Sequence, residues 1–248
     1  MQSRARIESE LPLYAGPTHR CAYLPGRVAK DVFAIDPGVD SAAYQQMMDA
    51  GYRRSGRVFY RPTCDGCREC VPIRVPVAEF AASKSQRRVQ RRNEDVRVEI
   101  ARPRATDRKW EIFAAYQAAA HDGKMCDERA DFERYLYDSP IDTLEFTYWV
   151  GRRLAGVGIV DACPGCLSSV YFYYDPVEAK RSLGVFSALR EIEECRARRL
   201  PYWYIGFYVR GCAAMSYKAG YRPYELLGEG GEWRRAEQES RATDCESR

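Results

Sequence analysis

Three apolar segments in the second half of the chain limit the fold more than any other feature. FTYWV (146–150), LAGVGIVDA (154–162) and LSSVYFYYDP (167–176) are rich in β-branched and aromatic residues, and only the short GRR and CPGC segments separate them. Strands joined by turns this tight pair antiparallel with their neighbours. We therefore predict a three-stranded β-meander in this region.

An amphipathic helix and a further strand follow the meander. Residues 182–199 place Val185 and Leu189 on one side of a helix, PYWYIGFYV (201–209) is a strand, and residues 211–220 form a short helix. A strand that returns after a crossover helix lies parallel to an earlier strand. This order matches the second half of an N-acyltransferase fold, so we predict an α+β fold with a GNAT-type catalytic domain.

The turn before the long helix bears on the acyl donor. N-acyltransferases bind the pyrophosphate of an acyl-CoA at the start of this helix, on exposed backbone N–H groups of a glycine-rich turn. Here the turn reads EAKRSLGV and contains a single glycine, Gly184, where the CoA-binding pattern has two. The architecture thus favours acyl transfer, whereas the turn does not fit CoA.

The first part of the chain differs in character from the rest. It is polar and loop-rich, and its segment CVPIRVPVAEF (70–80) alternates apolar residues as a strand does. Pro72 and Pro76 place that strand at a sheet edge, because proline has no N–H to donate. We predict three parts: an N-terminal region with a cysteine cluster and a basic arm (1–104), an acyltransferase-like domain (105–227) and a disordered tail (228–248).

Composition limits the cellular compartment and the kinds of ligand that we expect. The net charge is only +4, so nucleic-acid binding requires clustered charge. The N-terminus has charges where a signal peptide needs an apolar core, and no later run is long enough to span a bilayer. We expect a cytoplasmic protein that does not enter a membrane. Its ten cysteines then indicate metal ligation, catalysis or burial instead of disulfides.

Three of these cysteines are closely spaced in the segment CDGCREC. Cys64, Cys67 and Cys70 lie three positions apart, and a four-ligand metal site needs one more thiolate. Zinc or an iron–sulfur cluster is one interpretation. Reduced structural thiols are the other.

A basic segment follows the cysteines. SKSQRRVQRR holds five positive charges and no negative one. On a helix or an extended arm they gather on one side and can neutralise several phosphates. The alternative is a solvated basic face. The residues concerned are Lys84, Arg87, Arg88, Arg91 and Arg92.

Several motifs resemble those of the aminoacyl-tRNA–protein transferases. GYRRSGRVFYRPTC, VPIRV and FAASKSQRRVQRRN are similar to the N-terminal half of that family. LSSVYFYYDPVEAKRSLGVFSALREIE and YWYIGFYVRGCAAMSYKAGYRPYELL are similar to its C-terminal half. The resemblance runs from Cys21 to Leu227. The short chain and the CxxCxxC form resemble the bacterial aspartate/glutamate leucyltransferases more than the longer eukaryotic arginyltransferases.

The resemblance implies a function. Leucine would pass from leucyl-tRNA to the α-amine of proteins that begin with Asp or Glu, and a downstream degradation adaptor would then recognise the product as an N-degron. No cofactor is required for this transfer, and Cys21 is the implied fourth ligand of a metal site. Alternatives are arginyl-tRNA as donor, an acyl-CoA N-acetyltransferase and a non-catalytic tRNA-binding module.

The residues are compatible with that chemistry. An aminoacyl-tRNA is an activated ester, so no ATP site is needed, and the sequence contains no P-loop. The attacking α-amine has a pKa of about 7.7–8.0 and is partly neutral in the cytosol. The protein must position the reactants, stabilise an oxyanion and pair the acceptor's carboxylate with a cation.

Candidate site residues come from the matching motifs. Arginines and an aromatic residue on one strand can pair bidentately with an acidic side chain. The alternative is an exposed basic strand. The candidates for acceptor binding are Arg53, Arg54, Tyr60 and Arg74. Catalytic candidates are Tyr173 and Asp175, where the third strand ends, and Lys218, which follows the last strand. Asp175 before a proline is also an ordinary turn residue. Tyr217 is expected to stack on the unpaired 3′ end of the tRNA.

Overall fold

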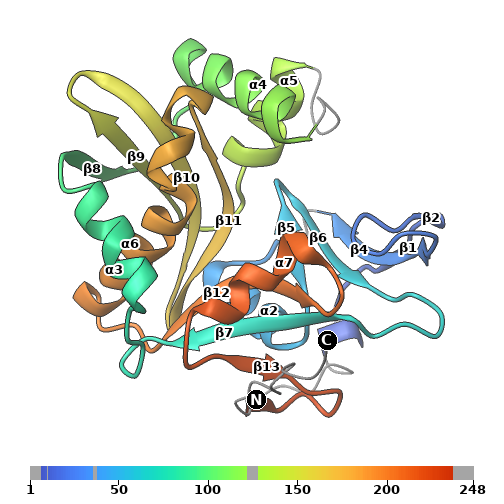
Figure 1. Cartoon of the computed structure of the whole chain (residues 1–248). Coiled ribbons are helices and arrows are strands. Elements are labelled where there is room, and N and C mark those ends of the chain that lie inside the picture. The colour runs from blue at the N-terminus through green and yellow to red at the C-terminus, as the bar shows by residue number, and fades with distance from the viewer. Residues whose placement is uncertain (1–6, 10, 36–37, 122–127, 237–248) are drawn as a thin grey trace, which may run out of the picture.

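One large mixed sheet dominates the computed structural model, which describes residues 7–9, 11–35, 38–121 and 128–236 (Figure 1). Its strand order is β14-β13-β7-β12-β11-β10-β9-β8. The strands are β7 (Cys70–Pro76), β8 (Val96–Ala101), β9 (Thr143–Val150), β10 (Arg153–Cys163), β11 (Cys166–Tyr174), β12 (Tyr202–Val209), β13 (Glu225–Leu227) and β14 (Trp233–Arg235). The predicted meander is confirmed, because β10 pairs antiparallel with both β9 and β11.

Helices cover both faces of this sheet. α6 (Leu183–Ala197) and α3 (Lys84–Arg92) lie on one face, and α4 (Asp107–His121) lies on the other with α5 (Arg129–Phe132) and the short helix η1 (Glu133–Tyr137) (Figure 1). Strand β11 shows the alternation that this arrangement requires. Phe172 packs in the core under α6, and Tyr173 packs in the core under α4. None of the described helices is long and apolar enough to cross a membrane.

A smaller sheet lies beside the large one. Its order is β1-β4-β6-β5, formed by β1 (Tyr14–Ala15), β4 (Asp31–Ile35), β6 (Val58–Pro62) and β5 (Arg53–Ser55). The chain also forms the pair β2 (His19–Arg20) and β3 (Val28–Ala29), and the helix α2 (Ser41–Asp49). Strands β7 and β8, which precede residue 104, belong to the large sheet. The division at that residue therefore stays a prediction.

Two expectations for the ends of the large sheet are wrong. β7 lies between β13 and β12 and not at an edge. It pairs with β13 only at Ile73 and Arg74, so Pro72 and Pro76 fall outside that short ladder and their missing N–H groups cost no bond there. The described part of the predicted disordered tail contains β14, which pairs with β13. Residues 237–248 lie outside the described residues.

The parallel pairing between β11 and β12 is short. It joins Cys166 to Tyr202, Leu167 to Trp203 and Ser168 to Tyr204. Beyond these pairs β11 continues along β10, whereas β12 continues along β7. The register of β12 on β7 shifts between Tyr204 and Phe207, around a glycine with positive φ. The two strands therefore diverge, and the segment after β12 forms α7 (Ala213–Ser216) and η3 (Tyr217–Gly220).

A buried ion pair joins the small sheet to the large one. Arg54 on β5 and Asp161 on β10 both have side chains that are 0% exposed. The Arg54 guanidinium donates two bonds to the carboxylate, one of them from Nε at 2.7 Å, and Asp161 also accepts from Thr143 Oγ1 at 3.0 Å. Breaking such a pair leaves an uncompensated buried charge.

We predict that Asp161→Asn lowers the free energy of unfolding by about 3–5 kcal/mol, because the Arg54 guanidinium then stays buried without a counter-charge. Denaturant unfolding measures the change. The matched control is Asp95→Asn, since Asp95 also pairs with one arginine but has a side chain that is 54% exposed. Its loss should cost at most about 1 kcal/mol. Equal, small effects of the two substitutions would contradict this account.

Candidate active site between two diverging strands

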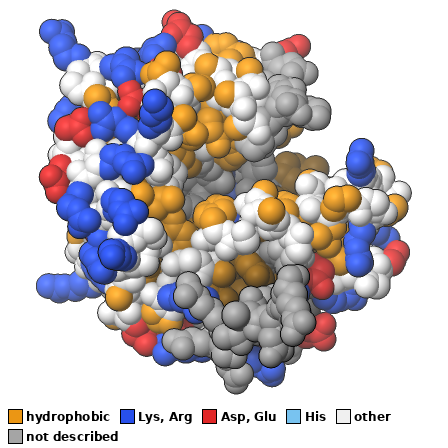
Figure 2. Space-filling view, in the orientation of Figure 1, with side chains coloured by type: hydrophobic (Ala, Val, Ile, Leu, Met, Phe, Trp, Pro, Cys, Tyr) orange, Lys and Arg blue, Asp and Glu red, His pale blue; other side chains and the backbone are white. Residues whose placement is uncertain are grey.

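Two cations meet where β12 bends away from β11. Lys218, on η3, donates from Nζ to the carbonyl oxygen of Phe207 at 2.7 Å. Arg53, on β5, donates from Nη2 to the carbonyl oxygen of Gly206 at 3.0 Å and from Nη1 to that of Tyr52 at 2.8 Å. Figure 2 shows that this face of the molecule is hollowed between the α4–α5 lobe and the lobe that carries α7 and β6.

Neither cation has a carboxylate partner among the described residues. Lys218 is 7% exposed and Arg53 is 5% exposed, and Nε of Arg53 has no hydrogen-bond partner. Burial, and next the charge of Arg53, lower the pKa of Lys218 to about 8. Two buried positive charges without an acid make this position attractive to an anion that loses its water on entry.

Aromatic rings surround the Arg53 guanidinium. Its Cζ lies 5.7 Å from the ring centroid of Tyr204 and 5.4 Å from that of Phe207. Tyr60 packs edge-on against Phe207, with 6.4 Å between ring centroids. Contact with π faces offsets part of the cost of burying the charge. Of the residues predicted from sequence, the structure therefore brings together Arg53, Tyr60 and Lys218.

A buried carboxyl that the sequence analysis missed marks the point where the strands separate. Glu191, on α6, accepts from Trp203 Nε1 on β12 at 2.8 Å and from the hydroxyls of Ser169 on β11 and Ser187. It is 3% exposed, and burial raises its pKa above the usual range. Tyr217 is 56% exposed.

The other predicted acceptor-binding residues are engaged elsewhere. Arg54 is held by Asp161 in the buried pair described above. Arg74 donates to Glu225 at 2.7 Å, and its guanidinium lies 3.6 Å from the ring centroid of Tyr202 and 4.2 Å from that of Trp233. These two arginines are structural in this geometry, because each already has a carboxylate.

Tyr173 and Asp175 also lie outside the cation pair. Tyr173 is fully buried under α4, and its hydroxyl lies 2.8 Å from that of Tyr137. Asp175 caps the helix η2 (Pro176–Arg181) by accepting from Val177 N at 3.2 Å. This is the ordinary turn role of an aspartate before a proline. A catalytic role for either residue has no support from these contacts.

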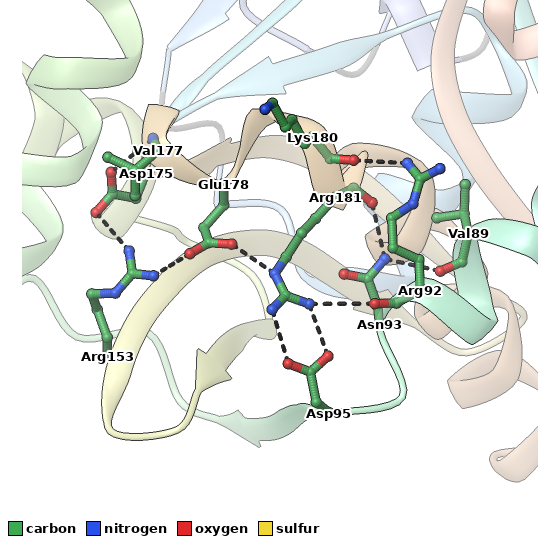
Figure 3. Close-up of polar contacts among 10 residues, drawn as sticks. All are labelled: Val89, Arg92, Asn93, Asp95, Arg153, Asp175, Val177, Glu178, Lys180 and Arg181. Carbon is green, nitrogen blue, oxygen red and sulfur yellow. Dashed lines mark hydrogen bonds and ion pairs between the residues drawn. The ribbon is translucent and has the colours of Figure 1, made fainter.

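The basic segment forms a helix. Ser83 and Gln86 cap α3 reciprocally, and the five predicted cations on it are exposed. Arg92 also donates to the carbonyl oxygen of Lys180 at 2.7 Å (Figure 3). Lys and Arg side chains run along the left of the view in Figure 2, over α3 and upward over β8 and the β9–β10 turn.

The four predicted metal-binding cysteines lie near one another. Burial, and next the charges of Cys64, Cys21 and Cys67, raise the pKa of Cys70 to about 12. The backbone N–H groups of Tyr23 and Leu24 lie 3.4 Å from Cys21 Sγ. In the part of the chain that the structure describes, no three His, Cys, Asp or Glu side chains are arranged to hold a metal ion. Cysteine thiolates are suitable ligands for zinc or an iron–sulfur cluster. In this structure, however, the thiols are not arranged as a metal site. The metal site stays a prediction.

Comparisons with known proteins give consistent results over most of the chain. Residues 19–88 match the family described as "Arginine-tRNA-protein transferase, N terminus", and residues 108–228 match its C-terminal counterpart. An aspartate/glutamate leucyltransferase of Hahella chejuensis is 36% identical over 221 residues, which cover 88% of this chain and 94% of that protein. One of Pseudomonas fluorescens is 38% identical over 224 residues, with the same coverage. Among solved structures, L-PGS of Bacillus licheniformis aligns over 94% of this chain and 88% of that chain, with 11% identity and a TM-score of 0.47.

Elemental analysis and absorption spectra of protein purified without oxygen test the cysteine cluster. If the four thiols share a metal or cluster, each Cys→Ser change at positions 21, 64, 67 and 70 should release it and lower the melting temperature, because metal affinity and folding are linked. Cys212→Ser is the control, since Cys212 is a free, half-buried thiol that is not one of the four predicted ligands. Active protein without metal, in which all four thiols titrate, would leave only the structural interpretation.

Proposed function

The chain belongs to the arginine-tRNA-protein transferase family, and we propose that it transfers leucine from leucyl-tRNA to the N-terminal α-amine of proteins that begin with Asp or Glu. Relatives that carry the name aspartate/glutamate leucyltransferase support the donor and the acceptor. The observation that carries the acceptor choice is the buried pair of cations, Arg53 and Lys218, for which the described part of the chain provides no carboxylate partner. The leucylated product is an N-degron for a downstream degradation adaptor.

The acceptor's side-chain carboxylate lies between the two cations in this proposal. Among the described residues, the buried Nε of Arg53 has no hydrogen-bond partner, and an acceptor carboxylate that enters the site would supply one. Lys218 already donates one hydrogen bond to a backbone carbonyl, and its ammonium has two donors left. A carboxylate there would restore charge balance to a buried position, and it would raise the pKa of Lys218 from about 8.

The main requirement of the reaction is that the protein align the α-amine with the ester carbonyl of the aminoacyl-tRNA. The neutral α-amine attacks the ester carbonyl carbon of the aminoacyl-tRNA, the new C–N bond forms, and the C–O bond to the terminal ribose breaks. The ribose oxygen leaves with a proton, and the amine loses one. An α-amine with a pKa of about 7.7–8.0 is partly neutral near neutral pH, so a strong base is not required.

The donor tRNA is held by two features in this proposal. The exposed cations of α3 bind phosphates without reading sequence. Tyr217 is 56% exposed, follows α7 directly and stacks on the unpaired 3′ end. The order of meander, crossover helix α6 and parallel return strand β12 supports an N-acyltransferase-like catalytic domain of GNAT type. Arginyl-tRNA is the alternative donor, which the family description favours.

Acceptor choice tests this function. With leucyl-tRNA as donor, Asp- and Glu-starting peptides should gain one leucine by mass. The Asn and Gln isosteres should lose roughly 30-fold or more in kcat/KM, which is about 2 kcal/mol of transition-state binding, because they leave the cations unpaired. Arg53→Gln should compress the Asp/Asn ratio. Arg210→Gln is the control, since Arg210 is exposed and directly follows β12, the strand whose Gly206 carbonyl oxygen Arg53 binds.

Two outcomes would contradict the proposal. If Asn-starting peptides react as fast as Asp-starting ones in the parent protein, the acidic-acceptor assignment is wrong. If only arginyl-tRNA yields a product, the family assignment stands and the leucyl donor does not.

A further inference from the structure

A second hollow lies at the opposite edge of the large sheet, by β8 and β9. It encloses about 920 Å³ between these strands, the β9–β10 turn and the first turn of α4. Arg102, Arg104, Arg152 and Trp149 are among its lining residues. None of the residues that line it belongs to the Arg53–Lys218 pair, and no motif of the sequence analysis pointed to it.

Positive charge dominates this hollow, even after internal ion pairs are accounted for. At its base Lys109 is buried and pairs with the buried Glu145. The cations that remain without a partner among the described side chains are three exposed arginines, Arg102, Arg104 and Arg152. The whole chain has a net charge of only +4. Three unpaired guanidinium groups around one hollow therefore produce a strong local positive potential.

An ion-pair network fixes this hollow relative to α3 (Figure 3). Arg181 on η2 binds Asp95 through two bonds of 2.8 and 2.9 Å and Glu178 through one of 2.6 Å. Arg153, which lines the hollow, pairs with Glu178. Its Nη1 also lies 3.7 Å from Oδ2 of Asp175.

The α3 end of the network is a helix cap. Asn93, the C-cap of α3, donates to the carbonyl oxygen of Arg181 at 2.9 Å. The acidic residues of the network are therefore used by arginines inside it. The outward-facing arginines on either side keep their charge for a ligand.

We propose that this arginine pocket, defined by Arg102, Arg104, Arg152 and Trp149, binds the phosphodiester backbone of RNA. Guanidinium groups bind phosphate oxygens bidentately. Trp149 lines the hollow and is half-buried, with the Arg97 guanidinium 5.4 Å from its ring centroid, and in this proposal its indole stacks on an unpaired base. The basic side chains continue from α3 over β8 to the β9–β10 turn (Figure 2). One RNA molecule thus contacts both faces at the β8 edge. The proposal rests on the proposed use of a tRNA donor and adds a contact site on the side of the sheet away from α3.

Binding of an uncharged leucine tRNA, measured from about 50 to about 200 mM salt, tests the pocket without requiring catalysis. The variant is R102Q/R104Q/R152Q. Its salt slope should fall by about 0.7–0.9 for each lost phosphate contact, and its affinity should fall at every salt concentration. The control, R198Q/R199Q/R234Q, removes three exposed arginines, two that directly follow α6 and one on β14, and should leave the slope near that of the parent.

A quadruple variant on α3, K84Q/R87Q/R88Q/R91Q, tests the basic segment in the same tRNA-binding measurement. Its loss of slope should add to that of the pocket variant, because the two sets of residues contact different phosphates. In the parent protein, tRNA should also protect Arg102, Arg104 and Arg152 from phenylglyoxal. This second measurement does not depend on the folding of any variant.

These experiments distinguish a failure of the pocket assignment from a failure of the proposed function. An unchanged slope in the pocket variant, an equal change in the control variant, or no protection by tRNA would overturn the RNA assignment. Selective loss of binding to a poly-glutamate peptide, with tRNA binding intact, would assign the pocket to an acidic protein instead. Failure of leucyl transfer while tRNA binding still depends on the pocket would refute the proposed function and leave the pocket assignment standing.

Discussion

The parallel pairing of β11 with β12 ends after Ser168 and Tyr204, and the candidate active site depends on that ending. Where the two strands separate, the carbonyl oxygens of Gly206 and Phe207 accept hydrogen bonds from side chains instead of from β11. Arg53 and Lys218 supply those hydrogen bonds. Because buried backbone carbonyls need donors, the divergence of two strands brings two positive charges into one buried place.

Arg53 and Arg54 show how adjacent residues acquire opposite roles. Side chains of neighbouring strand residues point to opposite faces. Arg54 points to Asp161 and holds the small sheet on the large one through a compensated charge pair. Arg53 points to the bend of β12, where no described carboxylate balances it. The first is a structural ion pair, and the second leaves a positive charge available to a ligand.

Much of the topology was predictable because it follows from local periodicity and short turns. The meander, α6 and the return strand were predicted, as was a helix as one form of the basic segment. Contacts between distant segments were not predictable from such patterns. The pairing of Arg54 with Asp161 joins residues from opposite halves of the chain, and Glu191 sits in the polar run REIEE, where nothing local distinguishes a buried carboxyl from an exposed one. Lys218 was predicted from its motif, but its position beside Arg53 required the fold.

The pKa of Lys218, measured by NMR on protein labelled at the lysine side chains, tests the central claim most directly. The account predicts a value near 8 in the free protein, well below the ordinary 10.5, since burial and Arg53 both disfavour the charged form. An Asp-starting peptide should raise this pKa, because its carboxylate supplies the missing counter-charge, and the Asn-starting isostere should not. An ordinary pKa in the free protein, or the same response to both peptides, would contradict the account.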